Sequence, residues 1–151
     1  MNVDFKLWEI VVNPPLVAAL VAMASAQVFK VVAPLGRGKP PELAKLTDYG
    51  GFPSGHTAFI TARAAGIGLK AGFDSALFAL AAVTASILIY DIVKLRKTVD
   101  LTRRETDRLL ERAGMTPLEK APQFGSHSVA EIVAGLVWGL VCAVATALLW
   151  P

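Results

Sequence analysis

The sequence predicts an all-α integral membrane protein, a helical bundle with about four transmembrane helices and one amphipathic surface helix. Two features of the composition predict this class: hydrophobic residues make up 54% of the 151 residues, and charged residues make up only 18%. The third is the pattern, because the charges gather in a few segments that separate long apolar runs. Soluble domains of average composition are less apolar and more charged. The length fits a single domain over residues 1–151.

The first two predicted helices differ in character. Residues 15–35 form an apolar run just long enough to span a bilayer, which takes about 20 residues. A cleavable signal peptide ending near residue 26 is the alternative, but Asp4 and Glu9 in its leading segment argue against it. Residues 53–71 are only weakly apolar and are rich in Ala, Gly and Thr. Since small residues let helices approach closely in a membrane, this second helix is expected inside the bundle.

Two further spans and a charged helix complete the predicted bundle. A short turn at residues 72–74 leads into a span over residues 75–95. Residues 98–114 are highly charged and carry only a few leucines, which predicts an amphipathic surface helix that stops at Gly114. The last span runs from residue 128 to Trp150, whose indole suits the membrane interface.

The distribution of basic residues predicts the orientation. Four spans put residues 36–52 and 97–127 on one side of the membrane, and the termini and the 72–74 turn on the other. The first side carries most of the Lys and Arg residues, namely Arg37, Lys39, Lys45, Lys97, Arg103, Arg104, Arg108, Arg112 and Lys120, against Lys6 and Lys70. The positive-inside rule therefore predicts a multi-pass protein of the cell (inner) membrane with this first side in the cytoplasm.

The composition also argues against several classes of protein. The single cysteine, Cys142, excludes an internal disulfide framework and a multi-cysteine metal site. The net charge of +3 is too diffuse to indicate a nucleic-acid partner. The sequence has no obvious carboxylate cluster for a metal, so neither a metal nor another cofactor is expected.

Polar residues occur where each predicted span meets the cytoplasmic face. They are Gln27 and Lys30 in the first span, Ser54, Gly55 and His56 in the second, Asp91 and Arg96 in the third, and His127 and Glu131 in the fourth. The predicted topology thus gathers two histidines, several cations and a helix N-terminus at membrane level.

The stretch GGFPSGHTA, residues 50–58, begins the second span. Pro53 suits a first helical turn because it has no N–H to leave unpaired. The N–H groups of Ser54, Gly55 and His56 are then expected to be free, and free amides at the positive end of a helix form an anion site. A simple helix cap and tight turn is the alternative.

The motifs resemble those of the type 2 phosphatidic acid phosphatase and vanadium haloperoxidase superfamily. Its central motif is Pro-Ser-Gly-His, found here at residues 53–56. Its first motif is matched by Lys30-x6-Arg37, although Gly38 replaces the usual proline, and the end of its third motif is matched by His127-x3-Glu131, with Glu for Asp. The third motif's arginine is missing, since Ala121 stands at its position. A divergent branch of small membrane proteins is more similar still, over residues 26–140, through the phrases Gly72-Phe73-Asp74-Ser75, Tyr90-Asp91 and Glu131-Ile132-Val133-Ala134-Gly135.

The resemblance implies a metal-independent lipid-phosphate phosphatase whose site lies at the membrane interface. His127 would carry a phosphohistidine, Glu131 would orient it, and His56 would protonate the leaving alkoxide. The implied phosphate-binding residues are Lys30, Arg37, Ser54, Gly55 and Arg96, the last standing in for the missing arginine. Tyr90, Asp91 and Arg63 would support the site, and the partners would be a phosphorylated lipid substrate and membrane lipids.

Each of these roles has a simpler alternative. Lys30 can reach the interface without binding a ligand, Arg96 can act as a positive-inside anchor, and Glu131 can complete a capping box with Ser128. Arg63, an intramembrane cation, is expected to face a partner such as Asp91 or Glu131, or a polar cavity. An inactive relative that binds anionic lipid headgroups and a small anion or lipid transporter remain alternative functions, and a homodimer remains an alternative to a monomer.

Overall fold

Four long helices, with two short 3-10 turns, make up the part of the chain that the computed structural model describes, residues 12–46, 51–116 and 128–150. No strand occurs in these ranges. In chain order the elements are α2 (Pro14–Val32), η1 (Ala33–Arg37), η2 (Leu43–Leu46), α3 (Gly55–Ala71), α4 (Ala76–Arg112) and α5 (Val129–Leu149). The predicted all-α class is confirmed, and the observed helices match the four predicted apolar segments.

Each long helix begins directly after a small polar residue whose side chain accepts a hydrogen bond from the first turn. The capping side chains are Asn13 for α2, Ser54 for α3, Ser75 for α4 and Ser128 for α5. Such a side chain satisfies one of the N–H groups that a helix start leaves without a backbone partner. The helix starts are therefore determined by local sequence.

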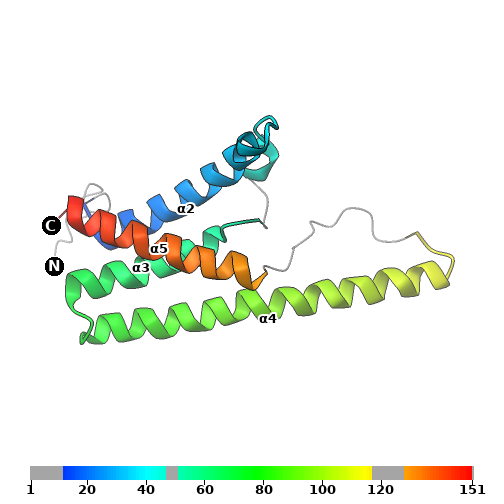
Figure 1. Cartoon of the computed structure of the whole chain (residues 1–151). Coiled ribbons are helices and arrows are strands. Elements are labelled where there is room, and N and C mark those ends of the chain that lie inside the picture. The colour runs from blue at the N-terminus through cyan, green and yellow to red at the C-terminus, as the bar shows by residue number, and fades with distance from the viewer. Residues whose placement is uncertain (1–11, 47–50, 117–127, 151) are drawn as a thin grey trace, which may run out of the picture.

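Helix α3 is the centre of the bundle and packs against α2, α4 and α5 (Figure 1). Its contact with α2 consists of alanines that are almost completely buried. Ala18 and Ala22 of α2 pack against Ala58 and Ala62 of α3. Short side chains allow close approach of helix backbones, and close approach maximises van der Waals contact where lipid provides no hydrophobic drive. The prediction that the second apolar segment lies inside the bundle is confirmed.

The closest helix contact joins α3 to α5 at two glycines of α5. A Cβ on Gly135 would lie 2.6 Å from the carbonyl oxygen of Ser54, and one on Gly139 would lie 2.5 Å from that of Ala58. Both glycines are buried and stand one helical turn apart. This small-xxx-small pair brings the backbone of α5 against the first two turns of α3.

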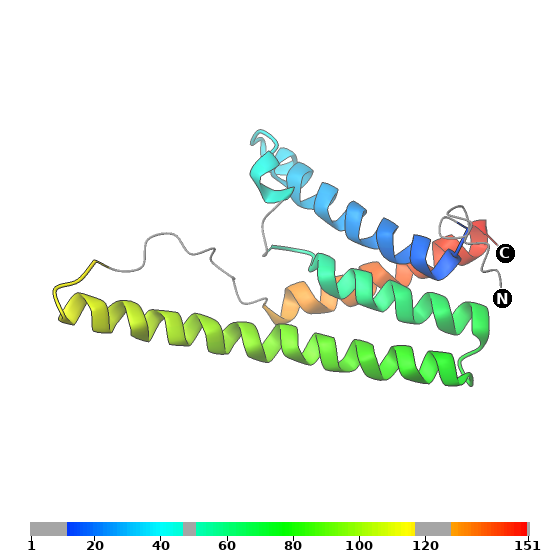
Figure 2. The same ribbon diagram turned by 180° about the vertical axis from the view of Figure 1, so that it is seen from behind.

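Three of the described helices are long and apolar enough to cross a membrane: α2 continued through η1, α4 and α5. The remaining helix, α3, has 17 residues and packs against all three of these helices. The start of α2, the end of α5 and the turn between α3 and α4 lie together at one end of the bundle (Figures 1 and 2). The protein is thus a membrane protein with three candidate transmembrane helices.

The predicted separate surface helix over residues 98–114 is wrong, because α4 runs without a break from Ala76 to Arg112. Its 37 residues span about 55 Å, well beyond the roughly 30 Å of a hydrocarbon core. No proline or glycine interrupts this range, so nothing in the local sequence ends the helix at the membrane surface. The charged part instead projects past the other helices (Figure 1).

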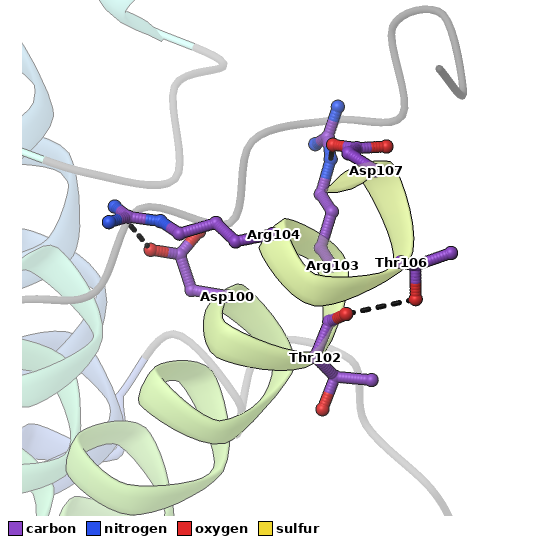
Figure 3. Close-up of polar contacts among 6 residues, drawn as sticks. All are labelled: Asp100, Thr102, Arg103, Arg104, Thr106 and Asp107. Atoms are coloured by element: carbon purple, nitrogen blue, oxygen red, sulfur yellow. Dashed lines mark hydrogen bonds and ion pairs between the residues drawn. The ribbon is translucent and has the colours of Figure 1, made fainter. Parts of the chain in front are cut away.

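Side chains one turn apart support the projecting part of α4. The Arg104 guanidinium lies 3.2 Å from the Asp100 carboxylate, and the Arg103 guanidinium lies 3.8 Å from that of Asp107 (Figure 3). Pairs of this kind on the surface of a helix add only a few tenths of a kcal/mol each. The predicted stop is confirmed, since α4 ends at Arg112 and Gly114 follows with a φ of 69°.

Candidate functional site

The polar starts of α3 and α5 are joined by a backbone hydrogen bond. The N–H of Ser54 donates to the carbonyl oxygen of Glu131 at 3.0 Å. This bond uses the amide that the sequence predicts to be free for an anion, so that part of the prediction is wrong. It also holds the Pro-Ser-Gly-His stretch against the first turn of α5, where Glu131 is half-buried.

The side chain of Ser54 is a buried cap. Ser54 is 0% exposed. Its hydroxyl oxygen accepts a hydrogen bond from the Thr57 N–H at 3.4 Å and lies 2.9 Å from the Thr57 hydroxyl oxygen. A hydroxyl buried in this way orders the helix start. The adjoining residues, Gly55 and His56, begin α3, and His56 is exposed.

The polar face of α2 lies against the same stretch. The side-chain oxygen of Gln27 is 3.6 Å from the place where a Cβ on Gly55 would stand. One turn further along α2, the aliphatic stem of Lys30 packs on Gly51, whose φ of 97° favours glycine. Lys30 is only 5% exposed, so its stem is covered and its charge is held at this end of the bundle.

Beyond Lys30 the chain folds back over the end of α2. The Lys39 N–H donates to the carbonyl of Pro34 at 3.1 Å, and the Glu42 N–H donates to the carbonyl of Val31 at 3.2 Å. Gly38 supplies the left-handed turn, with a φ of 70°, that this reversal requires. The glycine that departs from the superfamily's first motif therefore has a local structural reason.

This fold-back encloses a cleft of about 830 Å³ with a strongly basic lining. Four cations line it, Lys30, Arg37, Lys39 and Lys45, together with one carboxylate, Glu42. Lys45 and Glu42 form an ion pair at 3.1 Å. Gly51 and Phe52 complete the opposite wall, so the cleft joins the first two motifs. An excess of positive charge in a concave site attracts anions.

Lys39 and Lys45 were not predicted as site residues. Their charges indicated only the orientation of the chain in the membrane. A sequence signal was present, because both lie in the polar connection between the Lys30-x6-Arg37 spacing and the GGFPSGHTA stretch. Only the fold-back through η1 and η2 brings them beside Lys30.

Several predicted site residues lie outside this geometry. His127 is outside the described residues, and the side chain of Arg96 in α4 is not described. Tyr90 and Asp91 are exposed on α4 and do not line the cleft. Within the described ranges, no group of three His, Cys, Asp or Glu residues could hold a metal ion.

Arg63 forms neither of the predicted ion pairs in the part of the chain that is described. None of the ion pairs found there involves Arg63. Arg63 instead lies on an exposed face of α3 and lines a separate cavity with Asn13 and Lys70. Arg63 does not reach the cleft because it lies eight residues beyond Gly55, which is about 12 Å further along α3.

The bundle, the basic cleft and the motif at its edge define a helical membrane protein with a basic cleft at one end of the bundle. The model of the Divergent PAP2 family matches residues 11–142, and the chain belongs to that family. A protein of Bacillus subtilis (strain 168), described as the uncharacterized membrane protein YuiD, is 37% identical over 89 residues. That match covers 59% of this chain and 56% of the relative, so it spans little more than half of either protein. No solved structure shows significant similarity to the chain.

Proposed function

We propose that the protein is a lipid-phosphate phosphatase that hydrolyses a phosphomonoester at the membrane interface through a phosphohistidine. The observation that carries the proposal is the basic cleft in which Lys30 and Arg37 meet the edge of the GGFPSGHTA stretch. Membership of the Divergent PAP2 family supports the class of reaction. A substrate with its tail in the bilayer and its phosphate at the surface, such as phosphatidate or a polyprenyl phosphate, fits this location.

The proposed reaction assigns one step to each histidine. A ring nitrogen of His127 attacks phosphorus, and the bond from phosphorus to the lipid oxygen breaks. His56 donates a proton to that oxygen, so the lipid leaves as an alcohol. Water then attacks the phosphohistidine, His56 takes a proton from it, and phosphate and free His127 result. Glu131, four residues beyond His127, orients its ring.

The cations of the cleft have an electrostatic role in this proposal. Lys30 and Arg37 balance the charge on the phosphoryl oxygens, and Lys39 adds to the positive potential at the mouth of the cleft. Ser54 is assigned a positioning role, because its hydroxyl and its N–H are already bonded within the protein. Gly55 keeps the first turn of α3 open to a ligand, since it has no side chain.

We also propose that α3 is the fourth transmembrane helix and that the cleft faces the cytoplasm. The 17 residues of α3 span about 25 Å, close to the thickness of a hydrocarbon core. Its two ends lie level with those of α2 and α5, at opposite ends of the bundle (Figure 2). The basic residues of the cleft and of the projecting part of α4 then share the cytoplasmic side, as the positive-inside rule requires.

The test is phosphate release by the purified full-length chain in proteoliposomes, over a panel of lipid phosphates and with a chelator present. We expect release from at least one lipid phosphate, a loss of at least about a hundredfold in His127→Ala and His56→Ala, and a raised KM in Arg37→Gln. Arg108→Gln, which removes an exposed charge on α4, is the matched control and keeps wild-type rates.

Two outcomes would reject the proposal. Full activity in either histidine variant would reject the assigned chemistry. Binding of vanadate or of a lipid phosphate without any turnover would instead identify an inactive relative that binds anionic headgroups.

A further inference from the structure

A second concave site lies away from the basic cleft, between the start of α2 and the face of α3 that carries Arg63. Its volume is about 650 Å³. Helices α2 and α4 both pack on α3 but do not contact one another, which leaves this face of α3 open. The site, here called the Arg63 groove, is lined mainly by apolar side chains with two cations and one amide: Leu16, Ile67, Leu77, Arg63, Lys70 and Asn13.

The two cations stand on one face of α3. Arg63 and Lys70 are seven residues apart, which is two helical turns and about 10 Å along the axis. Both are exposed, and neither side chain forms an ion pair with another residue of the described ranges. Among the described residues, no carboxylate lines the groove. Such a positive, uncompensated face is costly in a membrane unless an anion balances it.

The Arg63 groove lies near one surface of the membrane, at the end of the bundle where α3 ends. Lys70 lies in the last turn of α3, and it also lines a smaller hollow of about 270 Å³ with Pro15, Ala143 and Trp150. Tryptophan is enriched where lipid headgroups meet hydrocarbon, so Trp150 indicates the headgroup level at this end. Arg63 is deeper, and a long arginine side chain can extend toward that level while its stem stays in apolar surroundings.

We propose that the Arg63 groove binds an anionic phospholipid of the leaflet on the side of the turn between α3 and α4. The lipid phosphate lies between Arg63 and Lys70, and an acyl chain lies along Leu16, Ile67 and Leu77. A guanidinium and an ammonium complement a phosphodiester, and the apolar wall complements the chain. This site is distinct from the basic cleft, which lies at the opposite end of the bundle.

Native mass spectrometry of the purified full-length chain, titrated with phosphatidylglycerol or phosphatidylcholine, tests the proposal. Every sample carries Arg37→Gln and Lys39→Gln, so that binding in the basic cleft is reduced. We expect phosphatidylglycerol to bind more tightly than phosphatidylcholine. Arg63→Gln should weaken the binding of phosphatidylglycerol about tenfold, because a charge-assisted hydrogen bond contributes at least about a factor of ten to the affinity. Arg63→Lys should keep most of the affinity.

The control variant is Arg112→Gln, which removes one exposed positive charge at the end of α4 and should leave lipid binding unchanged. Equal binding of the two lipids, or wild-type binding in the Arg63→Gln, Lys70→Gln double variant, would overturn the proposal. Binding that appears only after Asp4→Asn and Glu9→Gln would assign the groove to the chain's own amino-terminal carboxylates and would also overturn it. None of these outcomes depends on phosphatase activity.

Discussion

Replacing Gly135 by alanine adds one methyl group where the backbones of α5 and α3 approach closely. The new Cβ would lie 2.6 Å from the Ser54 carbonyl oxygen and 2.9 Å from the Thr57 Cβ. To restore an ordinary contact, α5 and α3 must separate by about 0.8 Å. The obstructing oxygen belongs to the backbone, so no side-chain rotation relieves the clash.

Two opposing effects decide the magnitude. Overpacking of this kind costs about 1–3 kcal/mol. Alanine also favours a helix over glycine by about 1 kcal/mol. Because the contact is with a fixed carbonyl, the steric cost exceeds the gain, and we expect a net destabilisation of up to about 2 kcal/mol. The shift also strains the Ser54 to Glu131 hydrogen bond, so the site is affected together with the packing.

The assay is thermal unfolding of the purified protein in one detergent, followed by circular dichroism. The matched control is Ala145→Leu, which adds more volume to α5 on an exposed face and should leave the melting temperature unchanged. If Gly135→Ala were as stable as the wild type, the argument that backbone contact at Gly135 limits the approach of α5 to α3 would be refuted.

Three further substitutions test individual contacts. Ser54→Ala removes the acceptor for the Thr57 N–H and should lower the unfolding free energy by about 1 kcal/mol, measured by the same melting assay. Gly55→Ala adds a Cβ with only an ordinary 3.6 Å contact to Gln27, so stability should hold or rise by up to about 1 kcal/mol while phosphate release falls. Retained activity in this variant would show that no ligand approaches Gly55. Thr61→Val removes a buried hydroxyl that has no hydrogen-bond partner among the described residues, and it should raise stability by about 1 kcal/mol; a lower melting temperature would contradict this.

The sequence predicts part of the basic cleft but not all of its lining residues. The Lys30-x6-Arg37 spacing predicted two of its four cations, and the GGFPSGHTA stretch predicted its far edge. Lys39 and Lys45 were missed, because their place beside Lys30 depends on backbone bonds to Pro34 and Val31 that close only when the chain reverses. The free Ser54 amide was wrongly predicted, because its partner is Glu131, 77 positions further along the chain.

The sequence by itself determined the local features of the structure, such as where each helix begins. Asn13, Ser54, Ser75 and Ser128 start the four helices, and Gly114 follows the end of α4, because capping and left-handed turns act within a few residues. The excess of small residues likewise indicated that α3 is an inner helix, because the size of a side chain limits how closely two helices approach.

Only the tertiary structure decided which surfaces meet. It placed Gly135 and Gly139 against the backbone of α3, joined Ser54 to Glu131, and put Arg63 in a groove of its own. It also left the charged half of α4 extending beyond the other helices, where the sequence predicts a separate surface helix. These outcomes depend on packing between segments far apart in the chain, and no short stretch of sequence contains both partners of such a contact.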